Sequence, residues 1–284
     1  MGEVCIVGAC EGWGSDQEPR ASTRPDRITK RQPEAITLED LAAYTPIVQE
    51  PIETEIAELR LIGMPPPSSG GVTMFEALEI MEASGYDFSS SKRTTDRVVL
   101  MIESLKHAFA DRSRYLADPA FTDVPVETLL DPENIARIAR SIDGRHHDPE
   151  TYGTFIAGSD GTQPLPDDDG TSHVCVIDPF GGGVAMTETI NHEFGSRVGV
   201  REFGFVLNNE MDDFTNPRKK SNGFGLVQSD RNEPEVGKRP LSSMSPTIVL
   251  DSEGRVFAIA GASGGPRIIT GTMQTLLNAM AGMD

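Results

Sequence analysis

The sequence is poor in cysteine and in basic residues. It has three cysteines, Cys5, Cys10 and Cys175, among 284 residues. Three cysteines are too few to form a disulfide framework, and an odd number cannot all pair within one chain, so such a framework is excluded. Lys and Arg number 25 against 44 Asp and Glu, which gives a formal net charge of −19. Such a chain repels nucleic acid and anionic membranes, so we expect neither as a partner.

Long apolar runs are also missing. No stretch reaches the roughly 18 apolar residues that a membrane span needs, so we expect no span in this chain. The first ten residues, MGEVCIVGAC, have no basic segment before their apolar patch, as a signal peptide would require. The localisation is therefore left open. The length suits one large domain or two small ones.

The first half of the chain has mainly helical patterns. Residues 1–33 follow no helical or strand period and predict loop or disorder. In the longest predicted helix, over residues 95–117, Val98, Ile102, Leu105 and Phe109 recur at helical spacing and predict a core-facing stripe. The other predictions are an amphipathic helix over 72–83, shorter helices over 36–44 and 132–142, one strand over 55–62 and an exposed loop over 143–170.

From Thr171 the pattern changes to the period of two that is typical of strands. Residues 172–178 and 182–190 predict a β-hairpin with two fairly apolar faces, as in a covered sheet. Cys175 lies mid-strand, where we expect it to be a buried packing residue. Further strands are predicted over 204–207, 246–251 and 255–261, and an apolar helix begins at Arg267. Helices followed by a covered sheet predict an α/β layered sandwich.

The junction Gly170–Thr171, where an acidic loop meets a rigid strand, has the form of a processing site. A threonine hydroxyl is a weak nucleophile unless a base lies beside it, and the α-amine of an N-terminal threonine can be that base. Cleavage after Gly170 would create such an amine. Taken alone, however, a glycine and a threonine at this position predict only the end of a loop.

Five downstream motifs give the junction more weight. They are TSHVCVID, TETINHEFG, LNNEMDDF, KRPLSSMSPT and GASGGPRIIT. In this order they resemble the small subunit of γ-glutamyltransferases, the glutathione hydrolases of the N-terminal-nucleophile superfamily. MPPPSSGG and HAFADRSRYLADP resemble the end of the large subunit, so the resemblance runs from Ile36 to about Met280. It implies an αββα sandwich, incomplete in this chain.

The resemblance also implies roles for individual residues. Thr171 would be both the self-cleaving residue and the nucleophile, and Thr189 would orient its hydroxyl. For His173, which belongs to the first motif, we expect a structural, hydrogen-bonded role, because the α-amine already supplies the base. No cofactor and no metal are expected. The remaining implied positions are Asn191, Glu210 and Asp213 for the substrate's α-amino group, Ser242 and Ser243 for its α-carboxylate, and Gly264 and Gly265 for the oxyanion hole.

The reaction implied is acyl transfer from glutathione-like γ-glutamyl amides to water or to an amino acid, through an acyl-enzyme on Thr171. Two alternatives stay open. One is a related β-lactam side-chain acylase or amidase, although Glu210 and Asp213 favour a substrate with an α-amino group. The other is an inactive fragment that needs a partner to supply missing parts.

The chain departs from the family pattern at its ends. In the family, the segment before Ile36 supplies several strands and an arginine for the substrate carboxylate, and residues 1–33 do not match it. Family chains also continue past the last residue here. We therefore expect a chain truncated at both ends, in which residues 34–170 (large-subunit-like) and 171–284 (small-subunit-like) form one domain and stay associated after cleavage.

Overall fold

The computed structural model describes residues 38–152, 170–200, 204–216 and 221–282. The loop predicted over 1–33 lies outside the described residues. Contacts divide the chain into two compact units, one of which is Ala9–Glu50. In that unit, helix α1 (Leu38–Ala43) forms within the predicted helix 36–44. The other helices and strands belong to the second unit.

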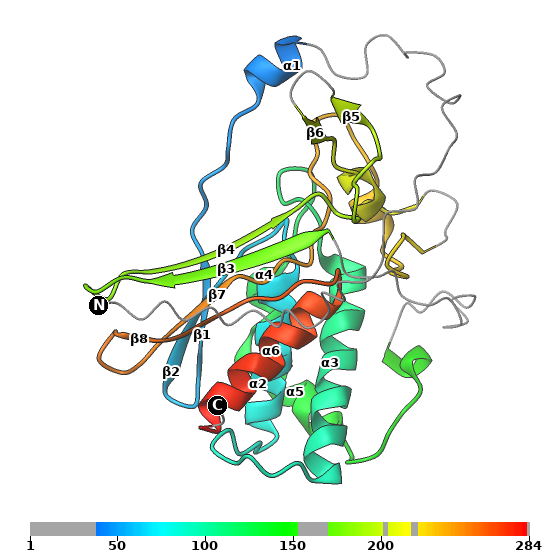
Figure 1. Ribbon diagram of the computed structural model, residues 1–284. Coiled ribbons are helices and arrows are strands. Elements are labelled where there is room, and N and C mark those ends of the chain that lie inside the picture. The colour runs from blue at the N-terminus through cyan, green and yellow to red at the C-terminus, as the bar shows by residue number, and fades with distance from the viewer. Residues whose placement is uncertain (1–37, 153–169, 201–203, 217–220, 283–284) are drawn as a thin grey trace, which may run out of the picture. The chain divides into compact units, whose positions relative to one another are not determined.

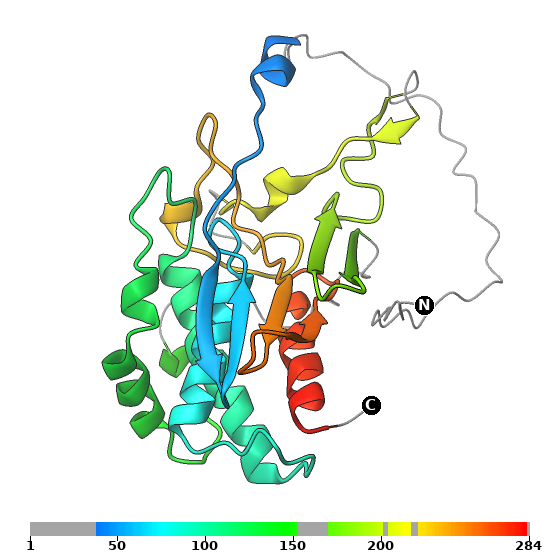
Figure 2. The ribbon, with the colours of Figure 1, turned by 90° about the vertical axis from the view of Figure 1, so that its left-hand side faces the viewer.

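Four antiparallel strands form the main sheet, in the order β1–β2–β7–β8 (Figures 1 and 2). Their bounds are Ile52–Ile56, Leu59–Gly63, Thr247–Leu250 and Val256–Ala260. The single strand predicted over 55–62 is wrong, because the chain reverses at Ala57 and Glu58. Both residues have positive φ, 50° and 65°, without a glycine to indicate the turn.

Helices cover one face of this sheet (Figure 2). Helix α2 (Gly70–Ala83) packs on β1 and β2, and α6 (Arg267–Met280) packs on β8. We predicted an amphipathic helix for 72–83, but α2 is buried on nearly every side between Gly70 and Met81. It is the central element of the core, because α3 (Thr95–Tyr115), α4 (Val126–Leu129), α5 (Pro132–Ser141) and α6 all contact it.

Helix α3 lies against α2, and only part of the predicted stripe faces the core, where Leu105 and Phe109 pack. Val98 and Ile102 are each 39% exposed, whereas the fully buried positions include Glu103 and Arg112. The prediction relied on apolar spacing alone. The helix instead turns a partly polar side to the interior, where Arg112 meets partners from distant segments.

A second layer is formed by the hairpin of β3 (Thr171–Ile177) and β4 (Gly183–Thr189), as predicted. The Cys175 thiol is buried, as expected, and donates to the Ile259 carbonyl of β8 at 3.5 Å. Side chains alternate along a strand, so Ile259 faces the hairpin while Ala258 and Ala260 join the core under the helices. Helices, main sheet and hairpin therefore form three successive layers.

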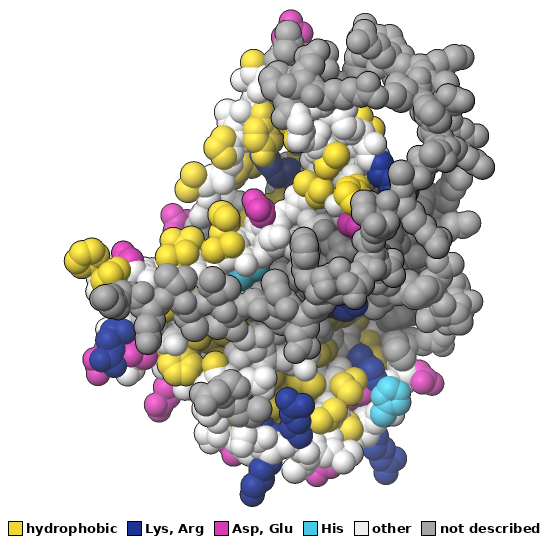
Figure 3. Space-filling view, viewed as in Figure 1, with side chains coloured by type: hydrophobic (Ala, Val, Ile, Leu, Met, Phe, Trp, Pro, Cys, Tyr) yellow, Lys and Arg dark blue, Asp and Glu magenta, His cyan; other side chains and the backbone are white. Residues whose placement is uncertain are grey.

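The outer face of the hairpin is open, in contrast to the covered sheet predicted from its two apolar faces. Val174, Val176, Val184 and Met186 are between 43% and 56% exposed. Hydrophobic side chains are visible over this region in Figure 3.

The segments after the hairpin are mostly irregular. Short strands β5 (Gly199–Val200) and β6 (Phe205–Val206) pair with each other, the latter within the predicted strand 204–207. Single turns of 3-10 helix form at Pro149–Tyr152, Glu210–Asp213 and Asp230–Asn232. In the part of the chain that the structure describes, no helix combines the length and apolarity needed to cross a membrane.

Candidate active site

The predicted site residues come together at one end of the hairpin. Eight of them line a small cavity of about 20 Å3, together with Phe224, Leu226, Met244 and Ile268. Gly264, also predicted, is buried and adjoins Gly265 in the chain. The eight are Thr171, Thr189, Asn191, Glu210, Asp213, Ser242, Ser243 and Gly265.

Thr171 and Thr189 face each other because they are register partners at the open end of the hairpin. Their hydroxyl oxygens are 2.9 Å apart. The Thr189 hydroxyl also donates to the carbonyl oxygen of Gly170 at 2.9 Å, and the Ile190 N–H donates to the same oxygen at 3.1 Å. The carbonyl that precedes Thr171 is thus polarised by two donors.

The direction of the hydrogen bond between the two threonines follows from their neighbours. Thr189 accepts a hydrogen bond from the Asn191 N–H at 2.8 Å, and its one hydrogen is donated to the Gly170 carbonyl, which can only accept. The hydrogen between the threonines must then come from Thr171. Its hydroxyl proton points toward Thr189, and its lone pairs are left available.

Two partly buried carboxyl groups, those of Glu210 and Asp213, lie on one side of the cavity. Burial raises the pKa of Glu210 and the pKa of Asp213 to about 7 each, and the charge of Arg112 opposes the shift at Asp213. Glu210 Oε1 is buried without a hydrogen-bond partner, and Asp213 Oδ1 accepts from Asn222 Nδ2 at 3.3 Å. Asn191 donates its amide to the Asn209 carbonyl, which leaves its side-chain oxygen as an acceptor. This side offers acceptors, and no cation of the described residues forms a hydrogen bond or ion pair with them.

The other side of the cavity offers donors. The Ser242 hydroxyl accepts a hydrogen bond from the Met244 N–H at 3.1 Å, and the Ser243 hydroxyl accepts one from Arg112 Nη2 at 3.1 Å. Among the described residues, neither serine hydrogen has an acceptor. Two hydroxyl donors next to each other fit the two oxygens of a carboxylate.

Gly264 and Gly265 lie where the chain turns from β8 into α6. Both have positive φ, 113° and 56°. A Cβ on Gly265 would lie 2.4 Å from the Phe224 ring, so a side chain at this position is strained by both backbone and space. Their carbonyls accept from the first turn of α6, and no described residue accepts a hydrogen bond from either N–H.

Sequence reasoning missed Arg112. Its side chain is fully buried behind the serine pair, where Nε donates to Ser69 Oγ at 2.8 Å. The ADRS stretch contributed to the resemblance only as a segment, and nothing in its spacing indicated contact with residues near position 242. His173, in contrast, is hydrogen-bonded as expected, through Nδ1 to the Thr187 hydroxyl at 2.7 Å.

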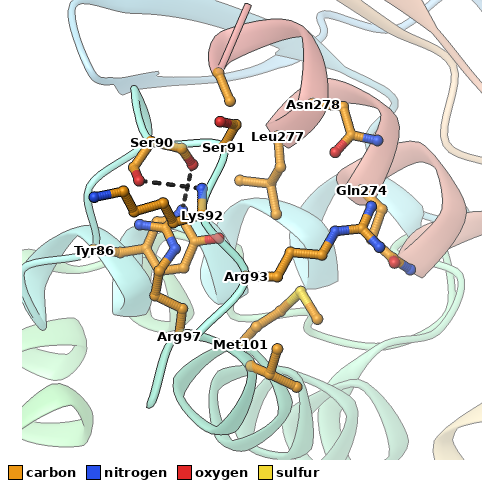
Figure 4. A pocket seen from close by; sticks show the side chains of 12 residues that line it. Tyr86, Ser90, Ser91, Lys92, Arg93, Arg97, Met101, Gln274, Leu277 and Asn278 are labelled. Carbon is orange, nitrogen blue, oxygen red and sulfur yellow. Dashed lines mark hydrogen bonds between the residues drawn. The ribbon is translucent and has the colours of Figure 1, made fainter. Parts of the chain in front are cut away.

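Another cavity lies away from these residues. It measures about 250 Å3 and is bounded by the segment 86–93, α3 and α6 (Figure 4). Lys92, Arg93 and Arg97 line it, but Figure 4 shows Lys92 and Arg93 extending to opposite sides. Arg97 is already engaged with the Tyr86 ring and with two carbonyls. Within the described ranges, no group of three or more His, Cys, Asp or Glu is placed to hold a metal ion.

Comparison with known proteins agrees with the motifs. The family model described as gamma-glutamyltranspeptidase matches residues 28–284. Glutathione hydrolase 2 from Arabidopsis thaliana is 44% identical over 249 residues, and the glutathione hydrolase proenzyme of Escherichia coli (strain K12) is 39% identical over 250 residues. Each alignment covers 86% of this chain and 41% of the relative, so the chain spans less than half the length of these proteins.

A solved structure supports the fold. The cephalosporin acylase from Bacillus halodurans superposes with a TM-score of 0.65 at 26% identity, over 86% of this chain and 40% of that one. The mixed α/β architecture is therefore shared with this acylase, and the family predicted from the five motifs is confirmed. The chain belongs to the gamma-glutamyltranspeptidase family.

Proposed function

We propose that this chain cleaves itself between Gly170 and Thr171 and then uses Thr171 to hydrolyse glutathione-like γ-glutamyl amides or to transfer their γ-glutamyl group to an amino acid. The observation that carries the proposal is the single cavity in which a hydrogen-bonded threonine pair, two partly buried carboxyl groups and two serine hydroxyl donors meet.

Self-cleavage starts from the hydrogen-bond chain at Gly170. Thr171 Oγ attacks the Gly170 carbonyl carbon; its proton passes to Thr189, which gives its own proton to the carbonyl oxygen. The Ile190 N–H stabilises charge that develops on that oxygen. The C–N bond then breaks, the proton moves to the departing nitrogen, and Gly170 is left as an ester on Thr171. Water hydrolyses the ester and frees the Thr171 amine.

The freed amine takes over as the base for turnover, since an α-amine has a pKa of roughly 7.7 to 8.0. It accepts the proton of Thr171 Oγ as the oxygen attacks the γ-amide carbon of the substrate. The N–H groups of Gly264 and Gly265 support the negative oxygen of the tetrahedral intermediate. The amine part leaves with a proton, and water or an amino acid's amino group then releases the γ-glutamyl group.

Recognition of the γ-glutamyl end uses both sides of the cavity. An ammonium group has three donors, which match Glu210, Asp213 and the side-chain oxygen of Asn191. The α-carboxylate accepts from Ser242 and Ser243. The partly buried carboxyl groups favour a γ-glutamyl substrate over the glutaryl group of a side-chain acylase, because a glutaryl group has no cation to satisfy them.

We also propose that the three layers described above belong to an αββα sandwich. The segments 34–170 and 171–284 would form one domain, with the two pieces held together after cleavage. Support comes from the pairing of β2 with β7, which joins strands from opposite sides of Gly170 within one sheet.

The test begins with a gel. The purified chain should separate into a piece ending at Gly170 and a piece beginning at Thr171, while Thr171→Ala should stay intact. A wild-type chain that remains whole after long incubation near neutral pH would refute the self-cleavage proposal and favour the inactive-fragment alternative. Turnover of a γ-glutamyl anilide but not of a glutaryl anilide would then support transferase chemistry, and the reverse preference would support an acylase.

A further inference from the structure

The side chain of Arg112 is buried in an unusual setting. It is 1% exposed and is the largest of the fully buried side chains among the described residues. Its two hydrogen-bond partners, Ser69 and Ser243, are neutral hydroxyls. Within the described residues, no carboxylate oxygen lies within 4.0 Å of its nitrogens. Because a buried cation without a paired anion is costly, its position calls for a reason.

Arg112 is charged at neutral pH in spite of its burial. Desolvation lowers its pKa to about 10, and the charge of Asp213 acts in the opposite direction. A guanidinium has donors only, so its contact with Ser243 has one possible direction. Ser243 must accept from Arg112, and its own hydrogen is thereby left for an acceptor in the cavity.

The same guanidinium also acts on Ser242. Ser69 accepts from Arg112 Nε, and the Ser69 hydroxyl and N–H both donate to the Ser242 carbonyl, at 2.6 Å and 2.8 Å. One side chain on α3 thus fixes both serines of the pair, one directly and one through Ser69.

We propose that Arg112 is a positioning residue for the substrate's α-carboxylate. Its guanidinium turns the Ser243 hydroxyl into the cavity and supplies the positive charge that selects an anion there. The inference rests on the proposed function of the serine pair. It assigns the selectivity for a carboxylate over a neutral group to a cation behind the serines, because two hydroxyls alone would also accommodate an amide or a water molecule.

The experiment compares two ligands that differ in this group. L-glutamate has the α-carboxylate and 4-aminobutyrate lacks it, while both keep the amine and the γ-carboxylate. Isothermal titration of the purified full chain should show tighter binding of glutamate. Arg112→Met should reduce that preference by roughly tenfold or more, as expected for loss of a charge-assisted contact. Arg114→Met, at an exposed position of the same helix, removes equal charge and should leave the preference unchanged.

Arg112→Lys covers the case in which the methionine variant does not fold by circular dichroism. It keeps the charge but cannot reach both serines as a fork, so we expect an intermediate loss, about threefold or more. A purely structural role would weaken both ligands alike and leave their ratio intact, and that result overturns the inference.

Failure of the inference and failure of the proposed function look different. If Ser243→Ala loses the preference while the Arg112 variants keep it, the carboxylate subsite stands and Arg112 has no part in it. If the wild-type chain binds glutamate no better than 4-aminobutyrate, the subsite itself is wrong, and both proposals fall.

Discussion

Replacing Thr189 by valine tests the hydrogen-bond chain at the cleavage site. Valine keeps the branched shape but removes the acceptor for Thr171, the acceptor for the Asn191 N–H and the donor to the Gly170 carbonyl. Loss of one donor to a developing oxyanion typically costs about 10² to 10³ in rate. We therefore expect self-cleavage to slow by about 10² or more, while Thr189→Ser, which keeps the hydroxyl, stays within about tenfold of wild type.

The assay is the first-order loss of intact chain on denaturing gels, with the N-terminus of the new piece identified by mass spectrometry. Thr187→Val is the matched control. Thr187 lies two residues earlier on the same strand and bonds His173, not the cleavage site. It should cleave at the wild-type rate. The orphaned Asn191 N–H is expected to cost about 1 to 3 kcal/mol of stability, so melting temperatures accompany the rates. A folded Thr189→Val chain that cleaves as fast as wild type would refute the relay.

Two further predictions concern carboxyl groups with raised pKa values. Glu210 and Asp213 have pKa values of about 7, and each binds an ammonium group only when it is ionised. The affinity for L-glutamate should therefore fall as the pH is lowered from 8 to 6, by up to about tenfold per pH unit for each group. Titration calorimetry with glutarate, which lacks the amine, should show no such fall, and a pH-independent glutamate affinity would contradict the assignment. Burial, together with the nearby charge of Asp111, raises the pKa of Glu76 well above its usual value of 4.5. The folded state therefore binds a proton at Glu76 more tightly than the unfolded state does. The stability that this proton contributes is lost as the pH rises from about 4.5 through the folded-state pKa. Glu76→Gln should therefore gain stability relative to wild type with rising pH, by at most about 1.4 kcal/mol per pH unit, measured by urea unfolding. Glu58→Gln, at an exposed position, should show no such gain. The same pH dependence of stability in all three chains would contradict the prediction.

Local sequence patterns were sufficient for most elements, and the motifs named eight residues that the fold brings to one cavity. The period of two over the hairpin set the register in which Thr171 and Thr189 meet. The turn at Ala57 and Glu58 was missed because neither residue type favours positive φ, and pairing of the flanking strands imposes it. Apolar periodicity also gave only part of the core-facing side of α3, since Leu105 and Phe109 pack against the core but Val98 and Ile102 do not.

Arg112 shows why that periodicity was insufficient. The spacing of apolar residues reports which side of a helix avoids water on average. It contains no information about a polar side chain that is buried by partners from far along the chain. Ser69 and Ser243 lie 43 and 131 positions away from Arg112, so only the tertiary fold brings the three together.

The pairing of β2 with β7 has a consequence for how the protein could be recovered after denaturation. In the uncut chain, the two strands are joined covalently, and the loop between them sets a high effective concentration. Once the bond after Gly170 is broken, the same sheet must be assembled from two molecules, and refolding becomes dependent on protein concentration. The uncut chain would then fold readily, whereas the two pieces of the cleaved chain would refold together with difficulty. The lifetime of the processed form would be governed by its unfolding rate more than by its equilibrium stability.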